Sequence, residues 1–126
     1  MIIITGASKG IGKFLFDKYN EQGKEVIGTY NSTIVTGYKP GSMYQVDITD
    51  DNQVNDFFLK IKDRLSEVVL INCAGANYSN FAHKANIDSW KKVIDINLFG
   101  TFNMIHHGLK VMRDQNYGRI INFSSI

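Results

Sequence analysis

The sequence predicts an α/β fold, in which the strands of one parallel sheet alternate with helices along the chain. Short apolar runs such as residues 2–4 and 68–71 fit strands that are buried on both faces of a sheet. The segments between such runs carry apolar residues at every third or fourth position, which is typical of amphipathic helices. The first apolar run leads directly into a glycine-rich turn. Together these observations predict consecutive β-α-β units.

The expected elements follow from this alternation. We expect strands at residues 2–5, 25–30, 43–46, 68–71 and 119–123, a loop at 31–42, and helices at about 10–22, 50–65 and 86–112. Gly23 is placed to end the first helix, Asp50 with Gln53 forms a capping box for the second, and Asn86 caps the third. We expect the following apolar side chains to face the core: Ile11, Phe14, Leu15 and Tyr19; Val54, Phe57, Phe58, Ile61 and Leu65; Trp90, Val93, Ile94, Thr101, Met104 and Ile105.

Composition limits the class of protein. The chain has 126 residues, 44% of them hydrophobic and 21% charged, which fits one soluble domain with its own core. A net charge of +2 argues against a nucleic-acid or membrane-surface partner, and the apolar runs are too short to span a bilayer. Met1 runs straight into the first strand without a secretory leader, and Cys73 is the single cysteine. We therefore expect a cytoplasmic protein without disulfides.

The glycine-rich turn carries the strongest functional signal. Gly6, Gly10 and Gly12 are spaced Gly-x-x-x-Gly-x-Gly between the first strand and the first helix. Glycines let backbone N–H groups approach a phosphate, and the start of a helix attracts its negative charge. In open parallel sheets, ligands bind at this end of the strands. The turn predicts a dinucleotide site, the alternative being a tight turn without a ligand.

Five motifs in order along the chain resemble those of the short-chain dehydrogenase/reductase family. They are residues 5–12 (Thr-Gly-Ala-Ser-Lys-Gly-Ile-Gly), 47–50 (Asp-Ile-Thr-Asp), 72–75 (Asn-Cys-Ala-Gly, with Cys73 in place of a second Asn), 96–101 with the helix asparagine Asn97, and 118–125, which resembles the strand that delivers the catalytic serine. The resemblance implies a Rossmann-type doubly wound parallel sheet, here incomplete, with about five strands in the order 3-2-1-4-5. Residues 1–126 would then be the N-terminal part of one NAD(P)-binding domain.

The resemblance also implies a reaction, which is hydride transfer between a nicotinamide cofactor and a carbonyl or alcohol carbon. Ser125 is the candidate catalytic serine, with Ser124 as the alternative, and Asn97 is the second candidate catalytic residue. None of the six tyrosines has a lysine four residues later, so the family's Tyr-x-x-x-Lys motif is absent from these residues. We therefore expect a truncated, cofactor-binding fragment that does not catalyse hydride transfer by itself.

The cofactor is expected to be NADP(H), with NAD(H) as the alternative. Residues 29–32 hold no carboxylate that would bind the ribose 2′-hydroxyl of NAD, and Lys9 could pair with a 2′-phosphate. The cofactor-binding residues implied by the resemblance are Gly6, Ser8, Lys9, Gly10, Ile11, Gly12, Tyr30, Asn31, Ser32, Asp47, Ile48, Asn72, Ala74 and Gly75.

Other conspicuous residues have simpler interpretations. His106 and His107 are adjacent on a helix and cannot ligate one metal from one face, so no metal is expected. Cys73 is expected to pack as a small apolar residue, and Lys91 and Lys92 to form a solvated helix face.

The predicted function is an NADP(H)-dependent short-chain oxidoreductase, similar to 3-oxoacyl-carrier-protein reductases, acting on a small-molecule carbonyl or acyl substrate. The resemblance implies a homo-oligomer at full length. The rival interpretation is a nucleotide-binding sensor or interaction module without catalysis; sugar reductases and small-alcohol dehydrogenases also stay open.

Overall fold

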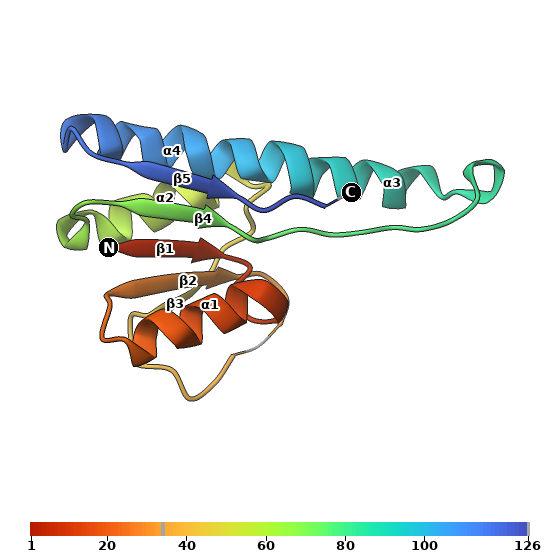
Figure 1. Ribbon diagram of the computed structural model, residues 1–126. Helices are drawn as coiled ribbons and strands as arrows, with labels where there is room; N and C mark the ends of the chain where they lie inside the picture. The colour runs from red at the N-terminus through yellow and green to blue at the C-terminus, as the bar shows by residue number, and fades with distance from the viewer. Residues whose placement is uncertain (34, 126) are drawn as a thin grey trace.

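Five parallel strands form one sheet in the order β3-β2-β1-β4-β5, as predicted (Figure 1). The computed structural model describes residues 1–33 and 35–125; Ile34, in the predicted loop at 31–42, and Ile126 lie outside them. The strands are β1 (Ile2–Thr5), β2 (Val26–Tyr30), β3 (Met43–Gln45), β4 (Val69–Asn72) and β5 (Arg119–Asn122). The helices are α1 (Gly10–Glu21), α2 (Asp51–Ile61), α3 (Ile87–Ile94) and α4 (Thr101–Asp114), with a π-helical segment (Asp95–Gly100) joining the last two and single 3₁₀ turns at Lys62–Arg64 and Ala82–Lys84.

Helices cover both faces of the sheet. Ile3 of β1 and Leu70 of β4 are fully buried in a cluster with side chains of α2 and α4. The next residues along the same strands, Ile4 and Ile71, point to the opposite face and pack with Phe16 of α1. Because both faces are covered, β1 and β4 are apolar at every position except the last, Thr5 and Asn72, and their sequences form continuous apolar runs.

The α2 prediction is confirmed for its apolar stripe and partly wrong for its cap. The five predicted core residues are all buried: Val54, Phe57, Phe58, Ile61 and Leu65. Asp50 caps the helix by accepting hydrogen bonds from the N–H groups of Asn52 at 3.0 Å and Gln53 at 3.1 Å. The Gln53 side chain, however, accepts from the Asp47 N–H at 3.0 Å rather than from that of Asp50. The helix start is therefore tied to the end of the β3 segment.

The predicted inner face of α1 is wrong at two positions. Ile11 and Phe14 are 57% and 61% exposed, whereas Phe16 is fully buried and Leu15 and Tyr19 are partly buried. The rotation of the helix is set by Gly12, which must face the turn before it, and Phe16 lies one helical turn further on that face. Ile11 is consequently turned outward. Gly23, with φ +71°, ends the helix as predicted.

The third predicted helix is interrupted and partly uncovered. Asn86 caps it as expected, accepting from the Ser89 N–H at 2.9 Å, and Met104 is fully buried. Trp90 and Ile94, predicted as core, are instead 55% and 40% exposed. Figure 1 shows the reason: α3 extends past the ends of the strands, so this part of the helix has no sheet beneath it. No helix in the described parts of the chain is both long and apolar enough to cross a bilayer.

A buried histidine connects α4 to α2. His107 is 5% exposed, its Nε2 lies 2.9 Å from Asp51 Oδ1, and its ring stacks on Phe58. This hydrogen bond lowers the pKa of the Asp51 carboxyl below its ordinary value of 3.8. The ionised carboxylate is therefore favoured in the folded state.

We predict that Asp51→Asn destabilises the protein in a pH-dependent way. A carboxyl with a lowered folded-state pKa stabilises the fold above its unfolded-state pKa, and this contribution is lost as the pH falls through the folded-state value. Urea unfolding should show the variant less stable than wild type at pH 7, with the gap narrowing below about pH 4. Asp56→Asn, an exposed change on the same helix, is the control. An equal loss at all pH values, or an equal loss in both variants, would contradict the role of the His107 contact.

Candidate functional site

The glycine turn after β1 depends on glycine for two separate reasons. Gly6 and Gly10 have φ values of +67° and +57°, which side chains disfavour. Gly6 and Gly12 also lie too close to other backbone for a side chain. A Cβ on Gly6 would lie 2.8 Å from Ala74 Cα, and a Cβ on Gly12 would lie 2.3 Å from the Gly6 carbonyl oxygen. The turn, the start of α1 and the end of β4 therefore meet backbone to backbone.

Thr5 holds this junction together; it is the first residue of the motif at 5–12, but no role was predicted for it. Its hydroxyl oxygen accepts hydrogen bonds from the N–H groups of Cys73 at 3.1 Å and Ala74 at 3.0 Å. On the other side of the turn, the Ala7 N–H donates to the Thr29 carbonyl at 2.8 Å. A hydroxyl residue between the apolar run and the first glycine is the sequence signal that could have identified Thr5. The bonds hold the carboxyl ends of β1, β2 and β4 together.

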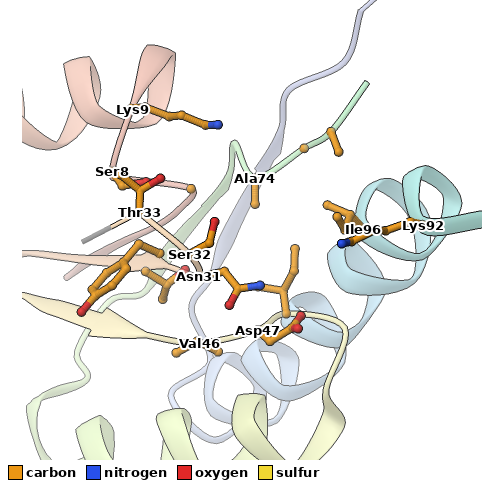
Figure 2. Close-up of a pocket in the computed structure, with 16 residues that line it drawn as sticks. Ser8, Lys9, Asn31, Ser32, Thr33, Val46, Asp47, Ala74, Lys92 and Ile96 are labelled. Atoms are coloured by element: carbon orange, nitrogen blue, oxygen red, sulfur yellow. The ribbon is translucent and has the colours of Figure 1, made fainter. Parts of the chain in front are cut away.

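A cavity of about 310 Å³ opens between the ends of β1–β3 and the helix formed by α3 and the π segment (Figure 2). The predicted residues that line it are Gly6, Ser8, Lys9, Tyr30, Asn31, Ser32, Asp47, Ile48, Ala74 and Gly75. Those that the sequence reasoning did not assign to a site are Thr29, Thr33, Val46, Ala76, Lys92 and Ile96. Lys92 was expected on a solvated helix face; its side chain is exposed, but it also borders this cavity.

Asp47 is the single carboxylate among these lining residues. Its Oδ1 accepts hydrogen bonds from the Thr49 N–H at 2.9 Å and from the Thr49 hydroxyl at 2.7 Å. These bonds fix the orientation of the carboxylate at the edge of the cavity. With Lys9 and Lys92 also on its walls, the cavity has an excess of positive charge.

A second cavity, of about 890 Å³, adjoins the first, with which it shares Lys9 and residues 74–76. It is lined by Ile11 and Asn97 and, from the segment after β5, by Phe123, Ser124 and Ser125. Both candidate catalytic residues thus border one cavity. The Asn97 Oδ1 accepts from the Ala76 N–H, and its Nδ2 donates to the Ala76 carbonyl, each at 2.8 Å. The π segment that carries Asn97 is thereby tied to the loop after β4.

A smaller cavity of about 220 Å³ lies at the glycine turn itself. Gly10 and Gly12, the remaining predicted glycines, line it. All three cavities share Lys9, Ala74 and Gly75, so they adjoin along the carboxyl ends of the strands. We refer to the three adjoining cavities together as the groove.

Asn72 is the predicted cofactor-binding residue that does not line this groove. It is buried in β4, where its Nδ2 donates to Asn122 Oδ1 at 2.8 Å and its carbonyl accepts from the Phe123 N–H at 3.0 Å. Its contacts hold β4 to β5, and so position the segment that carries Ser124 and Ser125.

Cys73 packs against the buried cluster that contains Ile4, Phe16 and Ile71. Burial raises the pKa of its thiol to about 11. The thiol therefore stays protonated and weakly nucleophilic at neutral pH. In residues 1–33 and 35–125, no three His, Cys, Asp or Glu side chains are grouped as a metal site requires.

The chain belongs to the short-chain dehydrogenase family, whose pattern it matches over residues 1–126. It is 35% identical over 133 residues to the acetoacetyl-CoA reductase of Paracoccus denitrificans, covering 98% of this chain and 54% of that protein. It is 28% identical over 131 residues to the 3-oxoacyl-[acyl-carrier-protein] reductase of Escherichia coli, with the same coverage of 98% and 54%. The chain thus spans about half the length of the curated relatives it matches.

Solved structures agree with this assignment. The structure of ElxO with NADP bound superimposes with a TM-score of 0.86 at 30% identity, covering 98% of this chain and 54% of that one. A short-chain dehydrogenase from Leptospira borgpetersenii with bound NAD⁺ gives a TM-score of 0.88 at 27% identity, covering 98% and 50%. The Rossmann-type fold is therefore confirmed; of these two neighbours, one structure contains NADP and the other NAD⁺.

We predict that Gly12→Ala loosens the junction between α1 and the turn. The added methyl group would press on the Gly6 carbonyl, and such overpacking costs about 1–3 kcal/mol. Gly23→Ala is the control: a Cβ there meets nothing within 4 Å, so only its positive φ, which Gly12 does not share, disfavours the substitution. In denaturant unfolding combined with NADPH titration, Gly12→Ala should lower both stability and affinity, whereas Gly23→Ala should lower stability alone. Unchanged affinity in Gly12→Ala would show that the close packing is not needed for binding.

Proposed function

We propose that this chain is the cofactor-binding part of an NADP(H)-dependent oxidoreductase that interconverts a carbonyl and an alcohol by hydride transfer. The observation that carries the proposal is the set of three adjoining cavities at the carboxyl ends of the strands. These cavities match the three parts of a dinucleotide: a base with its ribose, a pyrophosphate, and a second base with its ribose.

The pyrophosphate belongs at the glycine turn. The first residues of α1 present N–H groups that have no partner within the helix, and the helix dipole favours negative charge at this end. Gly10 and Gly12 border the small cavity there without side chains that would hold a ligand away. A pyrophosphate at this position directs the two halves of the cofactor into the two larger cavities.

The adenosine half belongs in the 310 Å³ cavity. Val46, Ile48 and Ile96 supply apolar walls for a purine, and the fixed Asp47 carboxylate supplies an acceptor for an amino group. Lys9, Ser32 and Thr33 supply a cation and hydroxyls near the end of β2, where a 2′-phosphate would lie. This set of side chains supports NADP(H) over NAD(H).

The nicotinamide half belongs in the larger cavity, beside Asn97 and Ser125. The cofactor supplies the hydride, and the chain binds and orients it. The Ser125 hydroxyl would hold the substrate oxygen, and Asn97 would keep the loop after β4 in place through its two bonds to Ala76. The 126 residues contain no Tyr-x-x-x-Lys pair to move the proton, so we expect binding without turnover by this chain alone.

The proposed substrate class is a 3-oxoacyl thioester. The relatives named acetoacetyl-CoA reductase and 3-oxoacyl-[acyl-carrier-protein] reductase support this choice, because both names describe a carbonyl at the third position of an acyl chain. The direct test of the proposed function is a titration of the chain with NADPH and with NADH, in which binding is monitored by the fluorescence of the cofactor. Saturable binding that is tighter for NADPH supports the proposal; no binding of either cofactor rejects it.

We predict that Lys9→Glu reverses much of the cofactor preference. A carboxylate at this position would repel the 2′-phosphate of NADPH, whereas NADH lacks that group. Since a hydrogen bond to a charged group contributes about 1.5–3 kcal/mol, the Kd for NADPH should rise about tenfold or more, with a much smaller change for NADH. Lys24→Glu, an exposed charge reversal outside the cavities, is the control. An equal loss for both cofactors would remove Lys9 as the basis of NADP(H) selectivity.

A further inference from the structure

Two neighbouring lysines on α3 differ in one respect that the sequence does not reveal. Lys91 and Lys92 are both exposed, but only Lys92 borders the 310 Å³ cavity. Figure 2 shows its side chain extending from the helix toward the cavity, across from the wall that carries Ser8, Ser32 and Thr33. In the described part of the chain, Lys92 makes no ion pair. Its ammonium is therefore available to a ligand.

The position of Lys92 relative to Ile96 defines what kind of ligand group it would meet. The two residues are four apart, so they lie on the same face of the helix, and both line the cavity. Ile96 also packs against the buried cluster that contains Val46 and Ile48. The apolar part of the cavity thus lies between these three side chains, with Lys92 one helical turn further from the sheet. Its methylene stem extends the apolar wall and its charge lies at the rim.

Two kinds of polar group border the apolar part of the cavity. Asp47 offers a fixed acceptor at one edge, and Lys92 offers a cationic donor at the helix edge. A flat heterocycle with an exocyclic amino group and ring-nitrogen acceptors complements both. A purine has these features, and a cation placed over such a π-system is attracted to its face.

We propose that Lys92 closes the base end of the cofactor pocket over the purine ring, its stem packing on the ring and its ammonium lying against the ring face or edge. The inference rests on the proposed binding of an adenine dinucleotide in this groove. It gives the two lysines of the cavity separate tasks. Lys9 at the turn acts on the 2′-phosphate, whereas Lys92 acts on the base, which all adenine nucleotides share.

The test compares Lys92→Ala with the matched control Lys91→Ala in titrations with NADPH, NADH and 5′-ADP. Exposed cation–π contacts contribute enough to change affinity about 2- to 5-fold, so Lys92→Ala should weaken all three ligands by about that factor and to a similar extent. Lys91→Ala should leave the three affinities unchanged. Lys92→Met, which keeps the stem but not the charge, should recover part of the loss.

The outcomes separate this inference from the proposed function. If wild type binds NADPH but Lys92→Ala behaves like Lys91→Ala, the role of Lys92 is rejected and the proposed function stands. If Lys92→Ala weakens NADPH but not NADH or 5′-ADP, Lys92 contacts the 2′-phosphate and the base assignment is wrong. If wild type binds none of the three ligands, both proposals are rejected.

Discussion

The site depends on the contact between three backbone segments that have no side chains between them. Gly12 at the start of α1 lies against the Gly6 carbonyl, and Gly6 lies against the backbone of Ala74 at the end of β4. The Thr5 hydroxyl secures this contact by accepting from two N–H groups of the β4 end. Any side chain at Gly6 or Gly12 would separate these segments, and the glycine turn would lose its shape.

This contact has consequences well beyond the turn. It fixes the rotation of α1, so that Phe16 enters the core while Ile11 is directed into the groove beside Ser124 and Ser125. It also brings the loop after β4 to the position where Asn97 bonds to Ala76. The glycine turn, the loop and the π segment therefore form one connected floor for the groove.

Much of the fold could be predicted from the sequence, because the spacing of apolar residues directly indicates the buried strands and the apolar stripe of α2. The failures occur where a neighbouring segment decides the outcome. Ile11 is exposed because Gly12 sets the helix rotation, and Trp90 is exposed because α3 runs past the sheet. For the site, the family resemblance of the motifs predicted most of the residues that line the groove. Lys92 could not be predicted, since only the three-dimensional path of α3 distinguishes it from Lys91.

A crystal structure of the chain with NADPH would show whether the groove holds an adenine dinucleotide with its pyrophosphate on the glycine turn. We expect the adenine between Ile48 and Ile96, the 2′-phosphate beside Lys9, and the nicotinamide in the cavity of Asn97 and Ser125. A nucleotide bound outside the groove, or bound with its phosphates away from Gly10 and Gly12, would contradict this expectation.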